Sequence, residues 1–180
     1  MIPSLYHYYE ASLGPFRNLS DLEPEEAEAV LEELRLRGTS FAGQRTPDYL
    51  AVRRSLETAA REQFIRKGGR PLRSRPHYMT LGECPWLLDW YEDGRQLDLS
   101  VGDFEEDRIS FTYGDLFPTM RYRDGKPYRG QIYTLKEITG LMDVYGLPQV
   151  WNPHGAGGPE RYIEVQIWDD RPLANRLKTL

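Results

Sequence analysis

The sequence has 180 residues and carries 23 lysines and arginines against 28 aspartates and glutamates, which gives a formal charge of −5. A chain of this length and of ordinary globular composition folds without disulfides, so we expect a single globular domain over residues 1–180. One cysteine, no apolar run of membrane-spanning length and no signal-peptide pattern predict a cytoplasmic protein that does not enter a membrane. The negative charge argues against wholesale coating of nucleic acid.

The first half of the chain predicts one strand followed by two helices. Residues 5–9 form a short segment rich in aromatic side chains, which is typical of a strand. A capping Ser20 and a closing Gly38 bound a first helix, whose apolar residues recur at helical spacing. A second helix is predicted between Thr46-Pro47 and the glycine pair 68–69.

The second half reads mainly as short strands. We expect strands at residues 97–101, 109–113 and 162–168, and a hairpin around Asp124-Gly125. A short aromatic helix is predicted at 85–91, and a capping box at Thr134 and Glu137 begins another helix that ends at Gly146. Residues 169–180 suit a loosely held tail. The order favours an α+β fold, with a mixed or antiparallel sheet and three to four helices.

A basic stretch stands out in this acidic chain. Six basic residues and one acid lie between residues 61 and 77, and the stretch ends in three arginines, Arg70, Arg73 and Arg75. These three, called here the arginine arm, suit the phosphates of a small molecule or nucleotide. The alternative is a helix end that favours cations, followed by a solvated loop.

The last predicted strand has an unusual polar face. Alternation places Ile163, Val165 and Ile167 on the core face. The other face presents Tyr162, Glu164, Gln166 and Trp168. Aromatic rings beside a carboxylate and an amide predict a cleft that stacks and orients a flat ligand, and we expect the arginine arm to border the same cleft. The alternative is a surface strand with cross-strand aromatic pairs.

Three residues in chain order resemble a known family. His7 on the first strand, Tyr113 after a middle strand and Glu164 on the last strand resemble the His-Tyr-Glu core of the ADP-ribosyltransferases. The resemblance implies NAD as the cofactor, with His7 on the ribose, Tyr113 on the nicotinamide and Glu164 in the catalytic role. Tyr8 and Tyr9 stand where the family has Gly-Ser or Gly-Thr, and Glu160 competes with Glu164. As a whole the chain is similar to a bacterial family of unassigned function.

Two other function classes remain open. Asp115 and the later Glu164-Val165-Gln166 are similar to the Asp…Glu-x-Lys core of restriction-nuclease-like enzymes, which hold Mg²⁺. Gln166 stands where that core has its lysine. The three histidines show no metal-ligand spacing, so they predict no metal site. An aromatic content of 12% would equally serve a non-catalytic protein-binding module.

Overall fold

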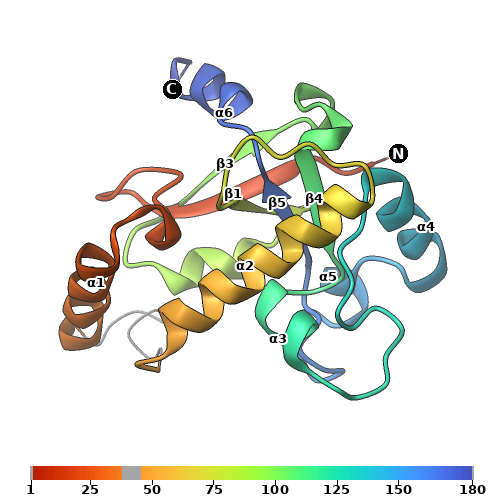
Figure 1. The fold of residues 1–180 in the computed structure, drawn as a ribbon, viewed down its shortest axis with the longest axis horizontal. Coiled ribbons are helices and arrows are strands. Elements are labelled where there is room, and N and C mark those ends of the chain that lie inside the picture. The colour runs from red at the N-terminus through yellow and green to blue at the C-terminus, as the bar shows by residue number, and fades with distance from the viewer. Residues whose placement is uncertain (1, 38–45, 180) are drawn as a thin grey trace.

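The protein is built on one antiparallel sheet of five strands, in the order β3-β1-β2-β5-β4 (Figure 1). The structure is a computed structural model that describes residues 2–37 and 46–179. The strands are β1 (Leu5–Glu10), β2 (His77–Leu81), β3 (Gly94–Leu99), β4 (Ile109–Thr112) and β5 (Ile163–Ile167). The predicted α+β class is confirmed, and all the strand pairs are antiparallel.

Helices lie on both faces of this sheet. They are α1 (Pro24–Arg37), α2 (Tyr49–Arg66), α3 (Leu116–Arg121), α4 (Leu135–Tyr145), α5 (Pro148–Trp151) and α6 (Arg171–Leu177), with short 3₁₀ helices η1 (Leu19–Asp21) and η3 (Pro85–Trp90). In Figure 1, α2 crosses in front of β5 and β4, and α4 lies to the side of the sheet. Within the described residues, every helix is too short or too polar to cross a bilayer.

One face of the sheet forms the main core. Ile163, Val165 and Ile167 of β5 are fully buried there, as their alternation predicts. Ile138 of α4 and Leu173 of α6 pack into the same cluster. Burying each such side chain contributes about 1.5–3 kcal/mol. Within the predicted tail, Arg171–Leu177 form α6, and Leu173 of this helix is anchored in the main core.

The other face of β5 is covered by α2. Trp168 lies at the end of β5 and is fully buried against Phe64 of α2, with ring centroids 6.4 Å apart. Gln166 is also fully buried, and Glu164 is 7% exposed. The face that the sequence predicts to line a cleft therefore lies in the interior, and its polar groups need internal partners.

The sequence predicts the helix boundaries well but errs at the hairpin. Thr134 and Glu137 form the expected capping box of α4, and Gly146 ends that helix with a φ of 73°. The predicted hairpin around Asp124-Gly125 is wrong: α3 ends at Arg121, and the residues that follow form a loop. The flanking residues offer no alternating apolar face to bury, so an Asp-Gly turn alone does not make a ribbon.

Candidate functional site

His7 fastens a turn rather than facing an open site. Its Nδ1 lies 3.0 Å from the carbonyl oxygen of Tyr78, and its Nε2 accepts the backbone N–H of Phe16 at 2.9 Å. The rings of His7 and Phe16 stack with their centroids 4.2 Å apart. Desolvation lowers the pKa of His7 to about 4, so the ring is neutral at pH 7. Neutrality fits the geometry, because only a neutral imidazole has a nitrogen that accepts a hydrogen bond.

Tyr113 is likewise built into the fold. Its ring is fully buried, and its hydroxyl donates to the carbonyl oxygen of Gly146 at 2.8 Å while it accepts from Trp151 Nε1 at 3.1 Å. Desolvation raises the pKa of Tyr113 to about 12. These contacts hold the corner between α4 and α5.

The three residues of the ADP-ribosyltransferase resemblance do not share a site. His7 is paired with Leu97, a residue of the main core, and Tyr113 belongs to that core as well. Glu164 directly follows Ile163, whose side chain points into the main core. Because side chains alternate along a strand, Glu164 points to the opposite face of the sheet from His7 and Tyr113.

The arginine arm is tied to carboxylates of the protein itself. Arg70 pairs with Asp107, Arg73 with Asp21 and Asp170, and Arg75 with Glu57 at 3.8 Å. The backbone N–H groups of residues 72 and 73 donate to the carbonyl oxygen of Trp168, each at 3.0 Å. The arm therefore does lie beside the end of β5, but its guanidinium groups bind loops and helices together.

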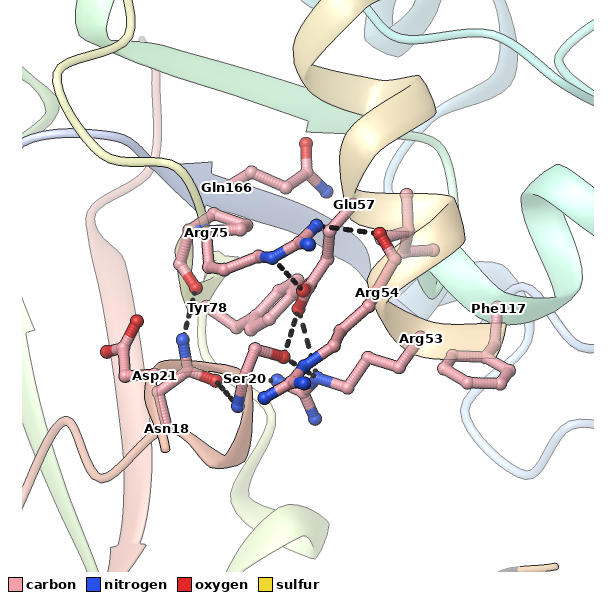
Figure 2. A network of polar contacts seen from close by, with 12 residues as sticks. Asn18, Ser20, Asp21, Arg53, Arg54, Glu57, Arg75, Tyr78, Phe117 and Gln166 are labelled. Atoms are coloured by element: carbon pink, nitrogen blue, oxygen red, sulfur yellow. Dashed lines mark hydrogen bonds and ion pairs between the residues drawn. The ribbon is translucent and has the colours of Figure 1, made fainter. Parts of the chain in front are cut away.

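A buried glutamate of α2, Glu57, is the centre of a polar network beside the arginine arm (Figure 2). Glu57 is fully buried, and its Oε1 accepts from Tyr78 Oη at 2.7 Å, Ser20 Oγ at 2.8 Å and Arg53 Nε at 3.0 Å. The Arg53 guanidinium lies 4.9 Å from the centroid of the Tyr78 ring. The second oxygen, Oε2, has no hydrogen-bond partner among the described residues, and Arg75 Nε lies 3.8 Å from it.

The sequence carried a signal for this cluster that the helix prediction did not use. Glu57 precedes the buried Ala60 and Phe64 by three and seven residues, so helical spacing places it on the buried stripe of α2. Arg53, four residues earlier, is its ion-pair partner. A charged pair on an apolar helix face is a mark of a buried ion pair.

Two hydrogen bonds reach the same oxygen of Glu164. Its Oε1 accepts from the backbone N–H of Leu116 at 3.2 Å and from Gln166 Nε2 at 3.3 Å. Gln166 is oriented in turn, because its Oε1 accepts from Ser110 Oγ at 2.9 Å and its Nε2 donates to Thr112 Oγ1 at 3.0 Å. The amide nitrogen therefore faces Glu164 and its oxygen faces away.

A second carboxylate lies next to Glu164. Desolvation, and then the negative charge of Asp115, raise the pKa of Glu164 well above its ordinary range. Asp115 accepts from the backbone N–H of Phe117 at 2.7 Å and from Tyr162 Oη at 3.1 Å. The site therefore places two acids side by side, and burial together with the neighbouring charge favours the protonated form of Glu164.

Glu160, the competing acid, has a structural environment. It is fully buried and pairs with Lys126 at 2.8 Å and with Arg129. Two cations thus match its charge, whereas Glu164 forms no ion pair with any described residue. Among residues 2–37 and 46–179, His, Cys, Asp and Glu side chains form no group of three or more that would hold a metal ion.

Comparison with known proteins returned no relative from which a role for these residues would follow: no protein-family model, no curated protein and no solved structure matches the chain.

Proposed function

We propose that the protein is an enzyme that cleaves or transfers a glycosidic bond, with Glu164 as its general acid and Asp115 as the charged partner. The observation that carries the proposal is the pair itself: a buried carboxyl group without an ion-pair partner among the described residues, beside a second carboxyl group that accepts two hydrogen bonds. Enzymes that cleave glycosidic bonds commonly use two carboxyl groups whose environments give them different pKa values.

The hydrogen bonds favour one oxygen of Glu164 as the carrier of the proton. Both donors to Glu164 reach Oε1, so that oxygen acts as the acceptor and the proton of the neutral acid belongs on Oε2. In the proposed step, Oε2 gives this proton to the leaving oxygen or nitrogen as the bond to the sugar carbon breaks. Asp115 offsets the positive charge that develops on the sugar. Water or another hydroxyl acceptor then adds to that carbon and gives its proton to the Glu164 carboxylate, which restores the acid.

This assignment changes the role that the sequence suggests for Glu164. A neutral acid offers little electrostatic stabilisation of a cation, so Glu164 acts by donating a proton and Asp115 supplies the charge. O-glycosides are the first substrates to test, because their leaving oxygen must take up a proton, whereas nicotinamide leaves NAD as a neutral base and needs none. Tyr78 and Tyr162 lie on the same side of the sheet as Glu164.

The test is turnover of a panel of nitrophenyl glycosides by the intact protein, with NAD as a comparison substrate whose leaving group needs no proton. We expect release of nitrophenol, and a loss of about 10²–10⁴-fold in kcat for Glu164→Gln. Because the acid must be protonated, kcat should fall as the pH rises through the pKa of Glu164. Glu62→Gln, an exposed position on α2, is the matched control and should keep full activity.

A measurement that needs no substrate tests the basis of the proposal. The carbon NMR shift of the Glu164 carboxyl group should titrate well above the range of exposed glutamates, and Asp115→Asn should lower its pKa. Gln166→Leu should raise that pKa further, because the Gln166 hydrogen bond favours the charged form. An ordinary pKa for Glu164, or full turnover by Glu164→Gln, would refute the proposed role.

A further inference from the structure

A hollow of about 430 Å³ opens between the turn that follows β1 and the last helix, α6. We propose that it binds an amphipathic carboxylate, a ligand with one carboxylate group on an unbranched apolar chain. The hollow lies by the main-core face of the sheet, where His77 contributes to its lining, so it is separate from the Glu164 site and does not depend on the proposed function. Its volume is within the range of small-molecule sites, roughly 300–1,000 Å³.

The walls are apolar, and one of them is rigid. Leu13 and Phe16 line it from the turn, and Leu173 and Leu177 line it from α6. Leu13 and Leu177 remain 50% and 41% exposed, although apolar side chains gain by leaving water. Phe16 has a φ of 59°, which a side-chain-bearing residue rarely adopts, and the His7 hydrogen bond to its backbone holds it there. The turn is therefore fixed in the shape that forms the wall.

The charges at the rim select the head group. Asp170 accepts from Arg73 at 2.6 Å, a cation that it shares with Asp21, and lies 3.1 Å from His77 Nε2. Arg17, in contrast, forms no ion pair with any residue in the described part of the chain. Its Nε donates to the carbonyl oxygen of Leu13 at 3.0 Å, which leaves the two terminal nitrogens for a ligand. A guanidinium group binds a carboxylate through two parallel hydrogen bonds.

The probe for this inference is octanoate, added to the full-length protein labelled with ¹⁵N. We expect saturable shifts of the backbone amides of Phe16 and Ala174, which line the two walls. Octanol has the same chain without a charge and octylamine has the opposite charge, so both should bind at least fivefold more weakly. Arg17→Gln and Leu177→Ser should each weaken octanoate binding at least fivefold, and Arg66→Gln, an exposed residue on α2, should leave it unchanged.

Three outcomes would overturn the proposal. Octylamine binding as well as octanoate would show that the acid at the rim, not Arg17, governs recognition. Equal binding by wild type and Arg17→Gln would remove the head-group contact. An absence of shifts in the two walls up to the solubility limit of octanoate would show that the hollow takes no such ligand. Arg17 and Leu177 are both exposed, so neither variant is expected to prevent folding.

Discussion

His7 makes the stability of the folded protein depend on pH. Its pKa is about 4 in the folded protein and about 6.5 in the unfolded chain, so between these values only the unfolded chain takes up the proton. The contribution of His7 to the free energy of unfolding is fully present above pH 6.5 and is lost as the pH falls toward 4. At about 1.36 kcal/mol per pKa unit, the gap of 2.5 corresponds to at most about 3.4 kcal/mol. The ring is only partly buried and solvent screens it, so we expect a loss of about 2–3 kcal/mol.

The assay is urea unfolding at pH 7.5 and pH 4.5, for the wild type and for His7→Gln. The glutamine does not titrate, so the variant retains the pH dependence of every other group and loses only that of His7. We expect the wild type to lose about 2 kcal/mol more than the variant between the two pH values. Equal losses, or a His7 ring that titrates near pH 6.5 by NMR, would refute the reasoning. In the folded state a protonated Nε2 would also face the N–H of Phe16, two donors in contact.

Three further substitutions test the packing. Thr134→Ala removes the side-chain cap of α4 and should cost about 1 kcal/mol in urea unfolding; an unchanged midpoint would show that the cap contributes nothing. Gly94→Ala would place a methyl group 2.4 Å from the backbone oxygen of Leu88, so we expect a loss of at least about 1–3 kcal/mol, and a neutral result would mean that η3 moves freely. Glu57→Leu leaves Arg53 without its buried partner and should cost about 3–5 kcal/mol; a stabilised variant would contradict the importance of that pair.

Local chemistry accounts for the parts of the fold that the sequence predicts correctly. The capping box at Thr134, the stop at Gly146 and the alternating β5 each depend on residues within a few positions of one another. The predicted hairpin depends on what its flanks can bury, and that is decided by distant segments. In the structure, Asp124 instead forms a bidentate ion pair with Arg129, whose guanidinium donates to both carboxylate oxygens. This pair links two parts of the loop.

The candidate site was predictable only in part, because the sequence does not say which side of a strand a distant helix covers. Period two correctly places Glu164 opposite Ile163. It does not reveal that α2 covers that side and changes a solvent-facing acid into a buried one. The arginine arm shows the same limit: it lies beside β5 because the strand that follows it, β2, pairs with β5, and its partners Asp107 and Asp170 come from other segments.

The strand order has a consequence for how the chain folds during synthesis. β5, which is made last, lies between β2 and β4, so neither of those strands has its full complement of neighbours until residues 163–167 leave the ribosome. Until then β1, β2 and β3 can pair, but β4 has no strand beside it. A nascent chain halted before residue 163 would therefore expose the unpaired edge of β2, which is a template for pairing with other chains. Completion of the sheet must accordingly wait until β5 has been synthesised and has left the ribosome.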